Sequence, residues 1–226
     1  MKLLVDDASL ENIKKMYGIF ACDGVTTNPS ILAKTGGSPY KTLSAIRKFI
    51  GSEAALHVQV TSSTAETMIA EAHAIISKLG KNTYVKVPTT AEGLKAMKAL
   101  SAEGIGITAT AIYTTAQAYL AAKAGADYVA PYVNRIDNLG GDGIETVRKI
   151  QNILENNGYK TQVLAASFKN SHQVMELCEY GIGASTVAPD VMEGLIKNAN
   201  VTSAVDAFTK DFYSLCGEGK TMIDCE

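Results

Sequence analysis

Short apolar runs alternate with longer amphipathic segments along the whole chain. The short runs are rich in β-branched residues and almost continuously apolar, which is typical of strands in a parallel sheet that is covered on both faces. They predict eight strands, at residues 2–6, 24–28, 55–60, 83–88, 106–113, 128–133, 161–168 and 184–189.

Each predicted strand is followed by a segment in which apolar residues recur at helical spacing. In residues 63–79, for example, Ala72 and Ile76 fall on one face of a helix, whereas Glu66 falls off it. The same spacing predicts helices at residues 9–20, 38–50, 63–79, 91–103, 114–124, 143–158, 171–181 and 190–198.

Eight strand–helix pairs predict an α/β protein folded as a (β/α)8 TIM barrel, near the lower size limit of about 200 residues for this fold. The alternative is an open doubly wound sheet, which usually has fewer strands and often a glycine-rich phosphate loop after the first one. The first predicted strand is instead followed by Asp7, Ala8 and Ser9. We therefore predict a single barrel domain over residues 1–226.

An amphipathic segment at residues 201–218 lies outside the eight pairs, and we expect it to form an additional C-terminal helix. Its apolar stripe would contain Val205, Phe208, Phe212 and Leu215. A helix outside a closed barrel has to bury such a stripe elsewhere, either on its own barrel or on a neighbouring subunit. We therefore expect a homo-oligomer in which this helix packs on a neighbour.

The charge and hydropathy of the chain argue against two classes of partner. The 21 Lys+Arg and 23 Asp+Glu give a formal net charge of −2, with no basic stripe that would bind nucleic acid. No apolar run is long enough to cross a bilayer, so we expect no membrane partner. Asp6 and Asp7 interrupt the first apolar run before it resembles a signal peptide, and we expect a cytoplasmic protein.

The four cysteines are expected to be separate reduced thiols. Cys22, Cys178, Cys216 and Cys225 form no CxxC pair, although two of them lie near the end of the chain. The three histidines are equally scattered, so neither residue type predicts a metal site. We expect no metal ion and no cofactor.

Polar residues stand at the ends of seven predicted strands, where barrels of this type place their catalytic groups. They are Asp6, Asn28, Gln59, Lys86, Thr110, Tyr132 with Arg135, and Ser167. Each residue has a structural explanation on its own. Together they predict a functional site at one mouth of the barrel.

Lys86 carries the most specific signal, because it lies between Val85 and Val87 in a strand and lysine rarely leaves water without a reason. One interpretation is a side chain that extends to the barrel rim and pairs with Asp6. The other is a nucleophile, because burial lowers the pKa of a lysine and a neutral amine forms a Schiff base with a ketone or aldehyde. We favour the nucleophile, since the resulting iminium makes C–C cleavage feasible without a metal.

The neighbouring polar residues have two interpretations each. Tyr132 is either an aromatic plug in the barrel or an acid–base group for a substrate hydroxyl. Gln59 and Thr110 either satisfy buried backbone groups or hold a catalytic water. Asp6 and Asn28 either cap the helices that follow them or bind substrate hydroxyls. Capping is the less favoured interpretation for Asn28, because a proline follows it.

Two segments are candidates for binding a phosphate. Arg135 either forms an ion pair with Asp137 or acts as one arm of a phosphate clamp, because a guanidinium matches phosphate geometry. Ser167 would supply a hydroxyl to the same anion. The GIGAS stretch at residues 181–185 is the second candidate, because it lies near the last predicted strand, where many barrels bind phosphate.

Longer motifs connect these residues to a known family. They are GVTTNPSI (24–31), VKVPTTAEGL (85–94), EGI (103–105), TAIY (110–113), GADYVAPYVNRID (125–137) and KTQVLAASFK (160–169). With these motifs the sequence resembles the transaldolase superfamily, and within it the branch of small fructose-6-phosphate aldolases and transaldolase-like proteins. The resemblance extends over nearly the whole chain.

The resemblance implies a (β/α)8 barrel and a class I aldolase mechanism with Lys86 as the Schiff-base lysine. The substrate-binding residues that we expect from it are Asp6, Thr26, Asn28, Arg135 and Ser167. The first three would bind hydroxyls and the last two a phosphate. Family members tend to form decamers of two pentameric rings, with the C-terminal helix on a neighbour, so a pentamer or decamer is expected.

Two positions distinguish the branches of the family. Transaldolases usually carry glutamate where this chain has Gln59 and phenylalanine where it has Tyr132, whereas the aldolases carry glutamine and tyrosine. The resemblance therefore favours an aldolase that cleaves or forms fructose 6-phosphate. A transaldolase is the alternative, and a non-catalytic ring protein that binds sugar phosphates is a more remote one. His57 and Thr108 depart from the family, because these positions are usually apolar in its aldolases.

Overall fold

The computed structural model describes residues 1–225, and its centre is a closed parallel barrel in which strands pair in chain order and β8 pairs with β1. The strands are β1 (Lys2–Asp6), β2 (Gly24–Thr26), β3 (Ala55–Gln59), β4 (Thr83–Pro88), β5 (Ile107–Ile112), β6 (Tyr128–Pro131), β7 (Gln162–Ala165) and β8 (Ala184–Val187). The predicted (β/α)8 fold is thereby confirmed.

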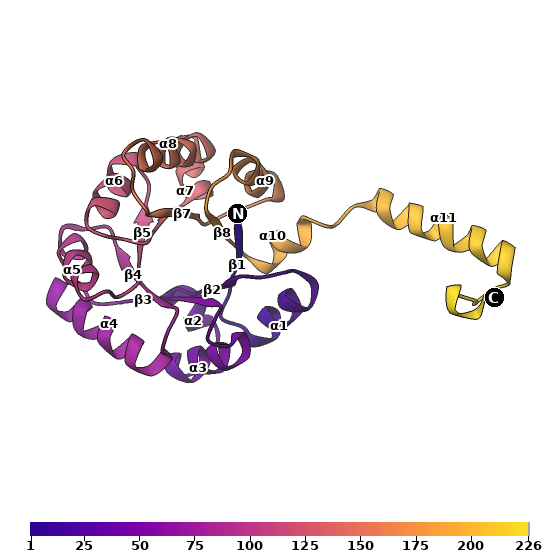
Figure 1. Cartoon of the computed structure of the whole chain (residues 1–226), viewed down its shortest axis with the longest axis horizontal. Helices are drawn as coiled ribbons and strands as arrows, with labels where there is room; N and C mark the ends of the chain where they lie inside the picture. Colours follow the sequence, from indigo (N-terminus) through magenta and orange to yellow (C-terminus); the bar gives the residue numbers. More distant parts are fainter. Residues whose placement is uncertain (226) are drawn as a thin grey trace. The chain divides into compact units, whose positions relative to one another are not determined.

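Helices surround the barrel, as Figure 1 shows. They are α1 (Leu10–Ile19), α2 (Pro29–Lys34), α3 (Pro39–Ile50), α4 (Ala65–Leu79), α5 (Ala91–Ala102), α6 (Thr115–Lys123), α7 (Val133–Asn138), α8 (Gly143–Asn156), α9 (Ser171–Tyr180) and α10 (Pro189–Gly194). Most of them begin at a Ser, Thr, Asn or Asp whose side chain accepts a hydrogen bond from the first turn, as at Thr64 for α4 and Asp142 for α8.

Two short helices, α2 and α7, were not predicted. They follow β2 and β6 directly, and six residues are too few to show a helical period. The predicted strand 128–133 is therefore shorter: β6 ends at Pro131, Tyr132 forms only an isolated bridge with Ala166 before the first turn of α7, and Arg135 lies on that helix.

The interior of the barrel is closed toward the N-terminal ends of its strands. A cluster of buried side chains fills it there, formed by Leu4, Tyr128, Leu164 and Ala184, with Tyr84 packed against them. Catalytic groups in such barrels lie at the opposite end. The apolar cluster therefore fills one end of the barrel interior and leaves the other end for polar side chains.

His57 and Thr108 form a buried polar contact inside the barrel, with His57 Nδ1 lying 2.8 Å from Thr108 Oγ1. The imidazole stacks on Tyr84 at 4.9 Å between ring centroids and meets the edge of Tyr128 at 5.3 Å. Burial lowers the pKa of His57 to about 3, and the positive charge of Lys86 adds to this shift. The histidine is therefore neutral at physiological pH.

The GIGAS stretch lies at the wrong end of the barrel for the role proposed from the sequence. Gly181 ends α9 and Ala184 begins β8, so the stretch lies at the N-terminal end of the strand and not at its C-terminal end. Phosphate sites in these barrels are built by loops that follow the strands. The second phosphate candidate is therefore wrong.

The chain divides into two compact units, Met1–Met192 and a second that begins at Glu193. The second unit contains helix α11 (Ala199–Cys216) and the short 3₁₀ turn η1 (Met222–Asp224). On α11 the side chains of Val205, Phe208 and Leu215 are 54%, 70% and 82% exposed. Within residues 1–225, no helix is both long enough and apolar enough to span a membrane.

Candidate active site

A cavity of about 280 Å³ opens at the C-terminal ends of the strands. Of the nine predicted site residues, seven line it: Asp6, Asn28, Gln59, Lys86, Tyr132, Arg135 and Ser167. The remaining two are hydrogen-bonded to members of this set, Thr26 to Asp6 and Thr110 to Tyr132. The fold thus brings all nine residues together at one end of the barrel.

Lys86 is directed into the barrel, and the residue is only 6% exposed. Its Nζ donates a hydrogen bond of 2.8 Å to the backbone carbonyl of Thr27, which follows β2. This contact holds the amine in the wall of the cavity and away from bulk water. The interpretation in which Lys86 extends to the solvent-exposed rim is therefore wrong.

The electrostatics of Lys86 and Asp6 are dominated by burial. Burial lowers the pKa of the Lys86 ammonium and raises the pKa of the Asp6 carboxyl, because low dielectric disfavours both charged forms. The attraction between the two groups acts against both shifts. The net lowering for Lys86 favours the neutral amine, which is the nucleophilic form.

The Asp6 carboxyl is held by a chain of hydroxyl groups. Thr26 Oγ1 donates to Asp6 Oδ1 at 2.7 Å and lies 2.6 Å from Thr186 Oγ1. Since the proton of Thr26 is used for Asp6, Thr186 is the donor in the second contact. Thr186 on β8 was not predicted. It lies two residues after Ala184, so its side chain is on the same inward face of the strand.

Asn28 caps α2, contrary to the expectation from the sequence. Its Oδ1 accepts a hydrogen bond of 3.0 Å from the backbone N–H of Ile31, and Pro29 occupies the first helical position. Proline suits this position because its missing N–H has no partner there in any helix. The cap uses the amide oxygen, so the Nδ2 group is the part of Asn28 that remains for a ligand in the cavity.

Tyr132 is fixed by three neighbours. Its hydroxyl lies 2.8 Å from Thr110 Oγ1, the ring of Tyr113 meets it edge-on at 5.5 Å, and the Arg135 guanidinium lies 4.6 Å from its ring centroid. Thr110 is followed by Ala111, which has a positive φ of 58° at an irregularity in the pairing of β5 with β6. Such bulges re-aim side chains next to active sites.

Arg135 does not use Asp137 as its partner. The Asp137 carboxylate instead accepts hydrogen bonds from Gly143 N at 2.6 Å and from Gln173 Nε2 at 2.7 Å. A hydrogen bond with Tyr113 raises the pKa of Arg135. Its guanidinium therefore stays charged beside the cavity, where it can bind an anion.

Ser167 has a left-handed backbone, with φ of 61°. This conformation is uncommon outside glycine and clusters at functional sites. The carbonyl groups of Ala166 and Ser167 accept hydrogen bonds from Val133 N at 2.9 Å and Asn134 N at 3.0 Å. The end of β7 is thereby tied to the first turn of α7, so that Ser167 and Arg135 are positioned by the same contacts.

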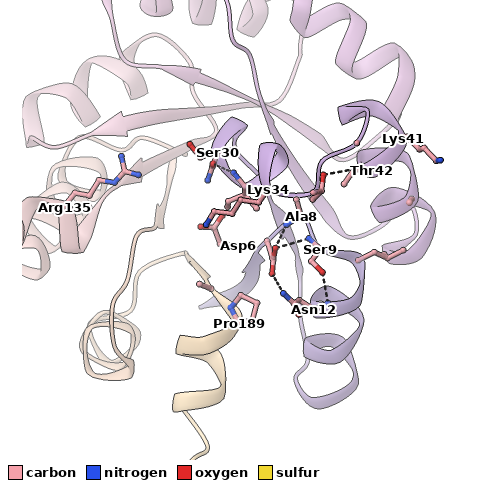
Figure 2. A pocket seen from close by; sticks show the side chains of 18 residues that line it. Asp6, Ala8, Ser9, Asn12, Ser30, Lys34, Lys41, Thr42, Arg135 and Pro189 are labelled. Carbon is pink, nitrogen blue, oxygen red and sulfur yellow. Dashed lines mark hydrogen bonds between the residues drawn. The ribbon is translucent and has the colours of Figure 1, made fainter.

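A wider pocket of about 1030 Å³ adjoins the cavity and shares Asp6, Asn28, Ser30 and Arg135 with it (Figure 2). Figure 2 shows Lys34 extending from α2 into this pocket, whereas Lys41 points away from it. Lys34 was not predicted, because it lies on one of the short helices that the sequence pattern did not reveal.

Comparison with known proteins agrees with this geometry. The sequence model of the Transaldolase/Fructose-6-phosphate aldolase family matches residues 3–222. A protein of Streptococcus pneumoniae (strain ATCC 700669 / Spain 23F-1), described as a probable fructose-6-phosphate aldolase, is 40% identical over 214 residues, which cover 94% of this chain and 96% of that protein. The chain therefore belongs to the transaldolase/fructose-6-phosphate aldolase family, as its motifs predicted.

Proposed function

We propose that this protein is a cofactor-free class I aldolase that cleaves and forms fructose 6-phosphate through a Schiff base on Lys86. Its family comprises lyases and transferases that act on sugar phosphates. The observation that carries the proposal is the buried Lys86 amine with its lowered pKa, which lines a cavity together with Asp6 and Tyr132.

In the cleavage direction, the Lys86 amine attacks C2 of fructose 6-phosphate and expels water to give an iminium. Tyr132, acting through a water held by Gln59 and Thr110, removes the proton of the C4 hydroxyl. The C3–C4 bond breaks, glyceraldehyde 3-phosphate leaves, and the electron pair is taken up by the iminium to form an enamine. Protonation of the enamine and hydrolysis release dihydroxyacetone.

The remaining residues orient the substrate. Asp6, Thr26 and Asn28 bind the hydroxyl groups of the dihydroxyacetone portion. Arg135 and Ser167 bind the phosphate, because a charged guanidinium and a neighbouring hydroxyl can both donate hydrogen bonds to its oxygens. The backbone hydrogen bonds between α7 and the end of β7 support a shared role for Arg135 and Ser167, because they hold the two residues near each other.

A transaldolase is the second candidate, in which the dihydroxyacetone unit passes to an acceptor such as erythrose 4-phosphate. Gln59 and Tyr132 favour the aldolase, since a phenol beside the iminium assists protonation of the enamine and release of free dihydroxyacetone. The test is the release of dihydroxyacetone from fructose 6-phosphate with and without erythrose 4-phosphate. The aldolase releases it without the acceptor, and a strict need for the acceptor would reassign the protein as a transferase.

A non-catalytic sugar-phosphate-binding protein is the remaining alternative. It predicts that Lys86→Ala retains the biological role, whereas the aldolase loses it. The buried amine counts against this alternative, because a lysine held out of water without a chemical purpose costs stability.

We further propose that α11 packs on a second copy of this chain. The exposed apolar side chains of Val205, Phe208 and Leu215 support this, because contiguous exposed apolar surface marks interaction sites. Light scattering of the full chain should give the mass of a pentamer or decamer, and a monomer would contradict the proposal.

A further inference from the structure

Cys216 and Cys225 lie next to each other in the second unit, with their Sγ atoms 3.0 Å apart. All four cysteines are free thiols, as expected, but the expectation that they lie apart is wrong for this pair. Both residues are half-buried, so that small molecules in solution can reach them. Neither belongs to the proposed active site.

The intervening sequence builds this contact. Helix α11 ends at Cys216, and Gly217 and Gly219 take positive φ angles of 105° and 75°, which reverse the chain. Thr221 and Asp224 then cap η1 reciprocally, with Thr221 N donating to Asp224 Oδ2 at 2.8 Å. This turn carries Cys225 back to the end of α11.

We propose that Cys216 and Cys225 are a reversible modification site, at which a hydroperoxide converts the two thiols into an intramolecular disulfide. The sulfur atoms have to approach by about 1 Å to reach disulfide bonding distance, which rotation of the two side chains supplies. The disulfide closes a loop over residues 216–225. It fixes the exposed Met222 and Ile223 next to the end of α11.

The contact assigns a different role to each thiol. Cys225 donates its S–H to Cys216 Sγ, and this hydrogen bond raises the pKa of Cys225, so we assign Cys216 as the attacking thiol and Cys225 as the resolving thiol. The Cys216 thiolate attacks one oxygen of the hydroperoxide, so that an S–O bond forms, the O–O bond breaks and hydroxide or alkoxide leaves. Cys225, once deprotonated, attacks the sulfenic sulfur of Cys216, an S–S bond forms and hydroxide leaves. Two thiols are oxidised and one peroxide is reduced to water or to water and an alcohol.

The other cysteines provide internal controls. Burial, with a contribution from the negative charge of Asp23, raises the pKa of Cys22 to about 11, which suppresses its thiolate. Cys178 lies within α9, on a different unit of the chain. The pair should therefore react before either of them.

The test is a peptide map of the full-length chain after titration with hydrogen peroxide. Trypsin cleaves after Lys210 and Lys220, so that the two cysteines fall on separate peptides, 211–220 and 221–226. Blocking with iodoacetamide followed by digestion without reductant should give these peptides joined, with the mass of two hydrogens lost. Dithiothreitol should separate them, and Cys22 and Cys178 should still be alkylated at peroxide levels that convert the pair.

Cys225→Ser is the matched variant, since it keeps Cys216 and the length of the turn. It should give no joined peptide, and its Cys216 should accumulate sulfenic acid, detectable by dimedone labelling. The proposal is overturned if wild-type Cys216 goes to sulfinic acid without the link, if disulfides form between chains, or if Cys22 or Cys178 reacts first. None of these outcomes depends on the proposed aldolase activity.

Discussion

The hydroxyl groups of Thr110 and Tyr132 lie 2.8 Å apart, across the ends of two neighbouring strands of the barrel. This contact orients the phenol in the wall of the cavity that also contains Lys86. A tyrosine placed in this way has a fixed hydrogen-bond partner on one side and the cavity on the other, which suits a group that exchanges protons with a bound substrate or water.

Tyr132→Phe should lower kcat for fructose 6-phosphate cleavage by about 10²–10⁴-fold, the usual contribution of a general acid–base group. The change removes only the hydroxyl, so KM should change little and Lys86 should still be trapped by borohydride. Steady-state kinetics with both products quantified provides the measurement.

Thr110→Val is the companion to this variant, because it leaves the phenol in place but removes its hydrogen-bond partner. Its kcat should fall less than that of Tyr132→Phe. Equal kcat values for wild type and Tyr132→Phe would show that the phenol does not take part in proton transfer.

Arg135→Ala should raise KM for glyceraldehyde 3-phosphate in the synthesis direction by about 10–100-fold, because a charge-assisted hydrogen bond to phosphate is lost. KM for glyceraldehyde, which has no phosphate, should stay close to the wild-type value. Lys41→Ala is the matched control, since Lys41 is another cation of the adjoining pocket but points away from it. A similar loss for both aldehydes would remove Arg135 from phosphate recognition.

Schiff-base formation should rise with pH and level off below about pH 10.4, the ordinary pKa of lysine, because burial lowers the pKa of Lys86 and the neutral amine is the reactive form. Asp6 attracts the ammonium and so raises this pKa. In Asp6→Asn the midpoint should therefore move to lower pH. The rate of borohydride trapping as a function of pH measures both midpoints, and an upward shift in Asp6→Asn would contradict the assigned electrostatics.

His57 should make the protein less stable as the pH falls. Its pKa is about 3 in the folded chain and about 6.5 when unfolded, so the unfolded state binds one more proton between these values. This contribution is present above about pH 6.5 and is lost as the pH falls toward 3.

Urea unfolding at two pH values measures this effect. From about pH 7 to about pH 5, the wild type should lose about 2 kcal/mol more free energy of unfolding than His57→Gln, which cannot take up the proton. Identical losses for the two proteins would mean that His57 is solvated or charged in the folded state.

The barrel could be predicted from the sequence because its strands are almost continuously apolar and most of its helices are long enough to show helical spacing. Eight β-branched runs alternate with amphipathic segments, and few architectures accommodate that pattern. The position of Lys86 followed from the same pattern, since a strand residue flanked by Val85 and Val87 on the opposite face has to face the barrel interior. The motifs that indicated the family lie at these strand ends, and the match of the family's sequence model to residues 3–222 confirmed it.

Features that depend on short elements or on backbone atoms were missed. Helices α2 and α7 are too short for a periodic signal, although Asn28 followed by proline is a helix-start pattern in its own right. The hydrogen-bond partner of Lys86 is the backbone carbonyl of Thr27. Every residue has such a carbonyl, so the sequence does not indicate which one accepts the bond. The contact between Cys216 and Cys225 required the glycine turn to be built in three dimensions.

The most direct measurement of the central claim is reduction of the enzyme with borohydride in the presence of dihydroxyacetone or fructose 6-phosphate, followed by peptide mass mapping. We expect one reduced dihydroxyacetone adduct per chain, on the peptide that contains Lys86, and no adduct in Lys86→Ala. An adduct on another lysine, or none at all while the enzyme still cleaves fructose 6-phosphate, would contradict the central claim.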